Sequence, residues 1–598
     1  AIDGELKAPG SGYANEGGSY ALSHTHTTQE NLYLAANLNY QINKDWEVHG
    51  FLREEYFNQY AQYNSESTNG GLIVPNQFFI KNSKQQASFN AYKFNTKRIV
   101  STIFMIGTSW KNQLFLDITG RNDWSSALVY SYGTGNFSYF YPSVSGSWII
   151  TETFKDKLPK WVSFAKVRGS WAQVGNDTSP YYINSGYSVA TYQRGDKKIY
   201  GMTIPENMKS TNLKPERKNA WEVGLDWRFF DSRIGVDLTY YKENTRNQIM
   251  TINVPWESGV KEKLINAGNI QNSGIEIALN TTPIKKKQWQ WDLNFTYTRN
   301  RNKIVELSPD VTSYINLDGA ANYGNYRIAS VAKVGSDYGM LMSDSWIKTD
   351  EKTGKPVVGY TNKFRTVYYK RGGTVKEVGS MLPNFLGSLN STLRWKDLSL
   401  YVLFDARFGG YVASYNSRYA TAYGFSGETE KYRKGMTWTS KYANAQDKVF
   451  TDGFIPDVVF DAGTIVTTPG GTNQDVSGMT YQEAYEKGYV EPAHLQSAAY
   501  FKNSWGTGVI NDDWFKKINY IALREITLSY NVPTKISSYI GAKNLSLSFT
   551  GRNLAYLLNT APNHENPESV RGTGAAQFRM RSFMPYTASY LFTLNATF

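Results

Sequence analysis

Residues 221–241 read WEVGLDWRFFDSRIGVDLTYY. Bulky apolar side chains alternate with polar or small ones on both sides of a short polar turn, Asp231–Arg233. A period of two is typical of β-strands whose two faces meet different surroundings. The stretch therefore predicts two antiparallel strands with charges on one face and aromatic or aliphatic groups on the other. Such a pair fits a sheet between lipid and water, and it also fits a soluble sandwich whose charged face points outward.

The same alternation recurs along the chain, most clearly in residues 34–42, 289–298, 398–407 and 545–550. Short and long connections alternate between the predicted strands. The short turns are placed near residues 43–45, 111–112, 231–233, 282–288 and 396–397, and the long connections near residues 55–96, 174–215, 307–383, 409–517 and 555–584. Short turns at one end and long loops at the other are typical of an all-β, transmembrane antiparallel β-barrel. The chain has room for about fifteen strands.

One helix is expected inside the fourth long connection. Residues Thr480–Lys487 read TYQEAYEK and are followed by Gly488. A Gly just after the last helical residue is a common stop. The long loops are polar and aromatic, so we expect them to be folded.

The composition agrees with a barrel and excludes several other classes of protein. Aromatic residues make up 15% of the 598 residues, yet the mean hydropathy is −0.48. A wet lumen with polar loops and aromatic girdles gives this combination, although a soluble β-propeller or a carbohydrate-binding array would also give it. The chain has no Cys, which excludes a disulfide framework. The net charge of +13 does not predict nucleic-acid binding, because the basic residues are scattered and the densest run, Lys285–Lys287, fits a solvated turn.

The end of the chain carries a second signal. Tyr590, Phe592, Leu594 and Phe598 share one face of a predicted terminal strand. A final strand that ends in Phe with this alternation resembles the assembly signal of outer-membrane barrels. Since such a strand ends at the periplasm, counting strands backwards places residues 1–30 in an extracellular loop and the barrel strands and loops in residues 31–598.

Five segments, in a shared order over nearly the whole chain, match one family. They are residues 121–126 with 141–148, 167–177, 213–216, 266–276, and 521–554. With these segments the chain resembles the SusC/RagA group of TonB-dependent outer-membrane transporters. The positions that carry the match are Arg121, Asp123, Gly175, Asn176, Pro215, Glu216, Asn266, Gly268, Asn272, Gly274, Glu276, Arg552 and Asn553.

The resemblance implies a 22-stranded barrel with an N-terminal plug, energised through TonB and covered by a SusD-like lipoprotein lid. It also implies import of oligomeric nutrients, either oligosaccharide or peptide, across an outer membrane of lipid and lipopolysaccharide (LPS). The chain covers roughly strands 8 to 22 of such a barrel. We therefore expect a second polypeptide segment that carries the plug and about seven strands. A passive porin, a secretion or adhesion barrel, and a secreted soluble polysaccharide-binding β-protein remain the alternatives.

Charged residues on the predicted lumen face are the candidates for contact with a ligand or a plug. They are Asp226, Arg228, Asp237, Asp292, Asp405 and Arg407. Ion pairing along the wall is the other role open to them. We expect no enzymatic activity, since nothing resembles a nucleophile elbow, and no cofactor. We also expect no metal site, because His24 and His26 have no carboxylate or Cys partner nearby in the sequence.

Overall fold

The computed structural model describes most of the chain, in ranges with short gaps. They are residues 2–7, 18–155, 157–254, 257, 259–308, 314–317, 328–363, 365–422, 425, 435–494, 515–570, 578–580 and 585–598. Within them, every helix is too short or too polar to cross a membrane. Two compact units divide the chain. The first comprises residues 1–159, 164–225 and 241–271, and the second comprises residues 160–163, 226–240 and 272–598.

Long antiparallel strands dominate the described residues, and fifteen of them have nine residues or more. They are β2 (Ser19–Gln41), β3 (Trp46–Leu72), β4 (Ser83–Trp110), β5 (Leu114–Ser125), β6 (Ser138–Ile149), β7 (Val162–Asn176), β11 (Glu216–Phe229), β12 (Ile234–Asn253), β13 (Glu262–Lys285), β14 (Trp289–Glu306), β21 (Phe385–Trp395), β22 (Leu398–Ser414), β29 (Phe515–Val532), β30 (Asn544–Asn559) and β32 (Ser589–Thr597). With the short β1 (Ile2–Lys7), β10 (Asn207–Lys209) and β31 (Arg579–Met580), they are assigned to one eighteen-stranded sheet. The all-β class and the estimate of about fifteen strands are confirmed.

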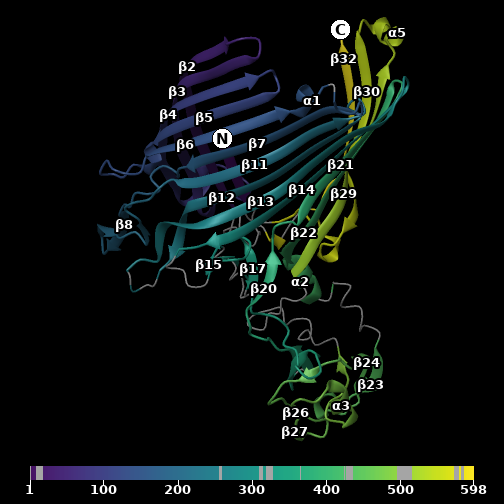
Figure 1. The fold of residues 1–598 in the computed structure, drawn as a ribbon. Helices are drawn as coiled ribbons and strands as arrows, with labels where there is room; N and C mark the ends of the chain where they lie inside the picture. Colours follow the sequence, from purple (N-terminus) through teal and green to yellow (C-terminus); the bar gives the residue numbers. More distant parts are fainter. Residues whose placement is uncertain are drawn as a thin grey trace. The chain divides into compact units, whose positions relative to one another are not determined.

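In the first unit, consecutive strands pair with their neighbours in sequence from β1 to β7. Figure 1 shows β2 to β7 side by side in the purple and blue part of the ribbon. The second unit repeats this plan, with β14, β21, β22, β29, β30 and β32 paired in that order. Such meanders need only tight turns at one end. Tight turns lie at the starts of β3, β5, β12, β14 and β22 as predicted, but the turn before β14 is shorter than the predicted 282–288, because β13 continues to Lys285.

Two predictions about the start of the chain are wrong. β2 begins at Ser19, so residues 19–30 form a strand rather than a loop. Residues 55–96 were predicted as a long connection, but β3 and β4 pair through most of that region and leave only residues 73–82 between them. The cause is the same in both places. Backbone hydrogen bonds hold a strand whatever its side chains are, and polar residues on both faces leave no alternation to detect.

The two faces of the sheet have opposite character in each unit. Along β5, Leu116 and Ile118 are 43% and 44% exposed, while Asp117 and Asp123 lie on the other face, where Asp123 is only 5% exposed. In the second unit, Phe549 lies opposite Phe592 in the register of β30 and β32, and both are more than half exposed. We call these the apolar face and the polar face. Exposed apolar side chains beside half-buried charges reverse the pattern of a soluble sheet and fit a sheet whose apolar face meets lipid.

Aromatic side chains gather at the short-turn ends of the strands. In the first unit the ring centroids of Trp46 and Trp110 lie 6.4 Å apart. In the second unit Trp289 stacks on Trp395 at 5.6 Å, directly opposite it in the register of β14 and β21. Lys396 lies over the Trp395 ring. Tyr and Trp rings with basic neighbours are typical of the level where lipid meets water.

The third and fourth long connections of the chain build one folded lobe, which spans residues 346–371 and 436–494. Its elements are β18 (Val357–Thr361), β19 (Thr366–Tyr369), β23 (Met436–Thr439), β24 (Val449–Phe454), β25 (Val459–Phe460), β26 (Ile465–Thr467), β27 (Asn473–Asp475), α3 (Tyr481–Glu486) and β28 (Ala493–His494). β18 from one connection pairs in parallel with β25 from the other. The two connections therefore fold together.

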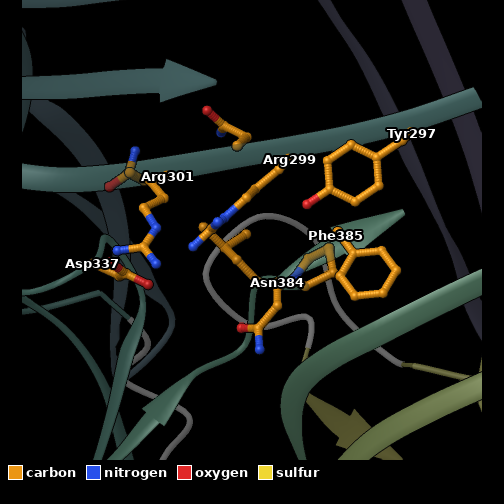
Figure 2. Close-up of a pocket in the computed structure, with 10 residues that line it drawn as sticks. Tyr297, Arg299, Arg301, Asp337, Asn384 and Phe385 are labelled. Carbon is orange, nitrogen blue, oxygen red and sulfur yellow. The ribbon is translucent and has the colours of Figure 1, made fainter. Parts of the chain in front are cut away.

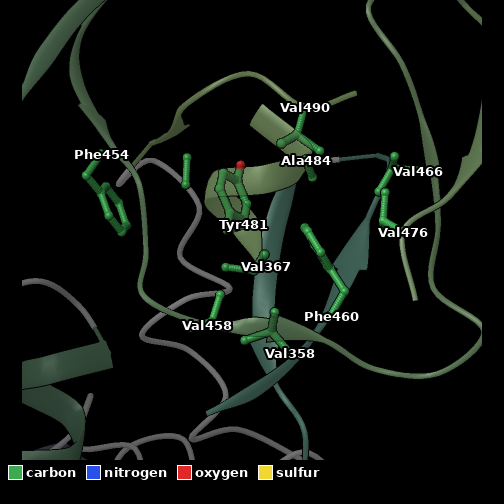
Figure 3. Close-up of a cluster of buried hydrophobic side chains, with 11 residues drawn as sticks. Val358, Val367, Phe454, Val458, Phe460, Val466, Val476, Tyr481, Ala484 and Val490 are labelled. Atoms are coloured by element: carbon green, nitrogen blue, oxygen red, sulfur yellow. The ribbon is translucent and has the colours of Figure 1, made fainter. Parts of the chain in front are cut away.

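The lobe has its own hydrophobic core, shown in Figure 3. Val358 and Val367 come from one connection, and Phe460, Tyr481 and other buried side chains come from the other. Phe460 stacks on Tyr481 with centroids 5.5 Å apart. The predicted helix is confirmed as α3, since Thr480 and Glu483 form a complete capping box and Gly488 follows with a φ of 72°.

The smaller elements fill the other connections. Residues 177–215 hold a hairpin of β8 (Ser188–Arg194) and β9 (Lys197–Thr203). β15 (Tyr314–Asn316), β16 (Ile328–Lys333), β17 (Met340–Ser343) and β20 (Lys376–Ser380) form a separate four-stranded sheet. In the described ranges, the α-helices outside the lobe are α1 (Ile150–Thr153), α2 (Tyr415–Ala422) and α5 (Thr534–Ser537).

The lobe core generates a stability prediction. We expect Phe460→Ala to cost the lobe about 3–5 kcal/mol, because Phe460 is 1% exposed and the substitution leaves a cavity. Hydrogen–deuterium exchange of residues 450–490 should then rise. Ile465→Ala is the matched control, since Ile465 is 53% exposed and its truncation should change exchange little. Equal protection in both variants would contradict a packed core.

Candidate functional site on the polar face

Asp292 lies on the polar face of β14 within a set of hydrogen bonds. Its carboxylate accepts from Thr282 Oγ1 at 2.8 Å and from Gln290 Nε2 at 2.9 and 3.0 Å. Arg394 Nη1 of β21 lies 2.8 Å from Asp292 Oδ2. The ion pair crosses two neighbouring strands. The hydrogen-bonding capacity of the Asp292 carboxylate is therefore used within the wall. This favours ion pairing along the wall over contact with a ligand.

Asp405 belongs to a larger group, which we call the Arg524 cluster. Its members are Asp405, Tyr520, Arg524, Tyr556 and Glu568. Arg524 reaches Asp405 Oδ2 through Nη2 at 2.8 Å and Nε at 3.1 Å, and it reaches Glu568 Oε1 at 2.7 Å. Tyr520 and Tyr556 also hydrogen-bond to Glu568 through their hydroxyls. The cluster joins three strands to the connection between β30 and β32.

A pocket of about 250 Å³ opens beside this cluster. Arg524, Tyr556 and Glu568 line it together with Asn553 and Tyr586. Tyr556 contacts Tyr586 edge-on at 5.0 Å. Tyrosine faces with convergent charged and amide groups can bind sugars or peptides, because the rings supply contact area and the polar groups fix orientation.

The pKa values of two carboxyl groups in the connection between β30 and β32 are shifted in opposite directions. Burial alone would raise the pKa of Glu568, but hydrogen bonds from Arg524 and Tyr556 hold its pKa below the usual value. Burial raises the pKa of Glu565 to about 7, and the single hydrogen bond from Ser414 Oγ at 3.0 Å opposes that only in part. Glu568 therefore stays charged at neutral pH, while Glu565 titrates there.

The other predicted lumen-facing residues make local contacts. Arg228 pairs with its neighbour on the same strand, with Nη2 3.1 Å from Asp226 Oδ2. Asp237 accepts from Thr239 Oγ1 at 3.4 Å. Arg407 donates to the carbonyl oxygens of Gly409 at 3.3 Å and Met381 at 3.1 Å. The structure therefore does not bring the six candidates into one site, and their contact with a ligand stays a prediction.

In the first unit, Arg121 lies at the centre of a network on the polar face. Its Nε is 2.7 Å from Asp123 Oδ1, Nη2 is 2.9 Å from Ser101 Oγ, and Nη1 is 3.4 Å from Glu55 Oε2. The Tyr141 hydroxyl donates to Asp123. β3, β4, β5 and β6 are thereby connected through side chains, which explains why Arg and Asp stand two residues apart in this motif.

Asn266 and Glu216 tie segments of the first unit together. Asn266 bonds both the N–H and the carbonyl of Lys214, at 2.6 and 2.8 Å, just before Pro215. Glu216 accepts from Ile249 N at 2.9 Å and from Asn176 Nδ2 at 3.1 Å. Gly175 leaves room for Tyr139, since a Cβ there would lie 2.6 Å from that ring.

The remaining motif residues have varied surroundings. Gly268 has a φ of 84°, Gly274 is buried, and Glu276 is exposed. In the second unit, Asn272 Oδ1 accepts from Asn302 at 2.8 Å, and Arg552 Nε lies 2.9 Å from Glu525 Oε2. These contacts are structural.

Arg524 and Glu568, which organise the candidate site, were missed from the sequence. β29 has a register irregularity between Leu523 and Glu525, so the period of two breaks at Arg524. Glu568 lies outside any strand, where alternation carries no information. A charged residue at the point where alternation breaks is the one signal that would have indicated Arg524.

Fold, exposed apolar face and polar inner network together define an integral outer-membrane β-barrel. The family model for the TonB dependent receptor-like β-barrel matches residues 3–416, well over half of the chain. The chain belongs to the TonB-dependent receptor family and represents its barrel region. This family consists of transporters rather than enzymes, and the soluble alternative is excluded.

Relatives and solved structures agree with that assignment. TonB-dependent receptor P26 of Formosa agariphila is 23% identical over 79% of this chain and 43% of its own length. TonB-dependent receptor SusC of Bacteroides thetaiotaomicron is 27% identical over 43% of this chain and 26% of its own length. The structure of the RagAB peptide transporter superposes with a TM-score of 0.71 at 16% identity, and it covers all of this chain and 58% of that one. The predicted likeness to the SusC/RagA group is confirmed, and the chain spans less than half the length of these curated relatives.

The pKa of Glu565 generates a pH prediction. An acid with a raised folded-state pKa binds its proton more tightly when folded, so packing around Glu565 is strongest below pH 4.5 and weakens as the pH rises to about 7. Glu565→Gln should remove this dependence. Hydrogen exchange of residues 560–570 should then match wild type at pH 5 and be slower than wild type at pH 8. An unchanged pH profile in the variant would contradict the assignment.

Proposed function

We propose that this chain forms the barrel wall and outer vestibule of an importer of oligomeric nutrients. In this proposal the import is energised through TonB and assisted by a SusD-like surface lipoprotein. The observation that carries the proposal is the Arg524 cluster with its pocket, which places three tyrosines, a guanidinium and two carboxylates together on the polar face. A passive porin needs no such built pocket.

The folded lobe supports the partner part of the proposal. Loops that only line a pore have no need of an internal core, whereas the lobe buries eleven hydrophobic side chains and carries ion pairs between its two segments. A rigid surface of this kind suits a second protein that must dock repeatedly. The RagAB peptide transporter gives a precedent for a two-component assembly with this fold.

The ligand class follows from the pocket chemistry only in part. Tyr586 and Tyr556 offer faces to either a sugar ring or a peptide side chain, while Arg524 and Glu568 are already paired. The pocket of about 250 Å³ holds one or two units of an oligomer rather than a whole chain. We favour a peptide, because the solved structure that shares this fold with a TM-score of 0.71 is described as a peptide transporter.

The experiment uses the full-length protein purified with its native partners from its own outer membrane. Mass spectrometry of the complex should detect co-purified oligopeptide. Uptake of that peptide mixture should be lost in a strain without the receptor and in a strain without TonB. Uptake that persists without TonB would establish the passive porin, and co-purified oligosaccharide in place of peptide would reassign the ligand.

The pocket itself is tested by Tyr586→Ala. We expect peptide affinity to fall about tenfold, since removing one stacking ring costs about 1–1.5 kcal/mol. Tyr539→Ala is the matched control, because Tyr539 is 89% exposed near the short turn before β30, away from the pocket lining. Affinity and uptake are measured with the same peptide mixture. Equal affinities in the two variants would remove this pocket from the proposed function.

A further inference from the structure

The apolar face of β14 changes its chemistry along the strand. Positions 289, 291, 293, 295 and 297 of this face are Trp, Trp, Leu, Phe and Tyr. The next three positions of the same face are Arg299, Arg301 and Lys303. Register with β21 is regular from Trp289 to Thr298, so no bulge exchanges the faces before the basic residues begin.

The distance along the strand places the basic residues at the membrane boundary. From Trp289 to Arg299 is ten steps, or about 33 Å at about 3.3 Å per residue. With a tilt of about 40° this corresponds to a height of about 25 Å, the thickness of the apolar band of a barrel. Since Trp289 lies at the short-turn end, Arg299 is the first residue beyond the band at the long-loop end.

A pocket of about 380 Å³ lies at this level. The ladder between β14 and β21 ends at Thr298, and β14 is next bonded at Ile304 by the segment Gly335–Ser336. The stretch between is an edge of β14 that opens into the pocket. An open strand edge is not tolerated in hydrocarbon, so this gap belongs to the polar headgroup layer.

The pocket has an aromatic side and a cationic side. Tyr297 contacts Phe385 at 5.3 Å, and Phe385 stacks on Phe408 at 4.8 Å, all from the apolar face. Figure 2 shows Arg299 and Arg301 extending from β14 toward Asn384 and Asp337. Among the described residues neither guanidinium has an ion pair, and Asp337 is the single acid that lines the pocket, so the lining carries a net positive charge.

We propose that this pocket binds a phosphate group of outer-leaflet LPS. The aromatic side would meet the upper acyl chains, and Arg299 and Arg301 would donate charge-assisted hydrogen bonds to the phosphate oxygens, with Lys303 just above. Arg299 and Arg301 belong to the apolar face of β14, whereas the Arg524 cluster lies on the polar face, from which Asn300 and Asn302 also line this pocket. A free phosphate would gain the same contacts with the guanidinium groups and none with the aromatic side.

The test uses the full receptor complex purified in mild detergent. Bound LPS is quantified by mass spectrometry in wild type, in Arg299→Gln/Arg301→Gln, and in Lys285→Gln/Lys286→Gln. The last variant removes the same charge from exposed residues at the short turn between β13 and β14, at the other end of β14. We expect the Arg variant to retain at least about tenfold less LPS and the Lys variant to match wild type. Equal retention in both variants would overturn the proposal.

A second measurement uses only the wild-type complex, so its result does not depend on whether the variant folds. Delipidated complex is titrated with bis-phosphorylated lipid A, with lipid A from which the phosphates have been removed, and with inorganic phosphate. Tight binding of the first alone supports the proposal. Equal binding of both lipids would show that the phosphate is not recognised, and competition by millimolar inorganic phosphate with equal affinity would identify a free-anion site instead.

Discussion

The backbone hydrogen-bond ladder between neighbouring strands is the constraint on which the rest of this structure depends. In lipid an unpaired N–H or C=O group costs several kcal/mol, so every strand must be continuous and in register with its neighbours through the apolar band. Register in turn decides which side chains share a face. The pairing places Phe549 on the same face as Phe592. It places the next residue, Thr550, on the other face together with Thr527. Departures from the ladder, at Arg524 and beyond Thr298, coincide with the two pockets that matter most here.

Much of the wall was predictable because membrane surroundings impose a readable pattern. Alternation found β11, β12, β14, β22 and β30, and local signals found the tight turns and helix α3, which has a capping box at Thr480. Predictions failed where that cause is missing. β3 and β4 continue beyond the band with polar residues on both faces, and no period distinguishes them from a loop. The Arg524 cluster and the lobe core depend on contacts between distant residues, which a single sequence does not reveal.

Most charged side chains named on the polar face form ion pairs with nearby residues. Asp226 with Arg228, Asp292 with Arg394, and Arg121 with Asp123 neutralise each other within a few residues of wall. Such pairs keep a wet surface ordered and contribute little free energy each when they are exposed. They also make most of the wall a poor binding surface, because its hydrogen-bond donors and acceptors are already occupied. Two places differ from that background: the tyrosine rings beside Arg524 offer contact surface, and the guanidinium groups beside Tyr297 have no acidic partner within the described part of the chain.

The lobe has a consequence for how the chain reaches its final form. Val358 and Phe460 are about a hundred residues apart, and the complete β21–β22 hairpin lies between them. Closing so long a loop carries an entropic cost that local strand pairing does not. The lobe should therefore be among the last parts to become ordered during biogenesis, after the strands that bracket it have been inserted. Its two segments are also bound to change together over evolutionary time, since neither can repack without the other.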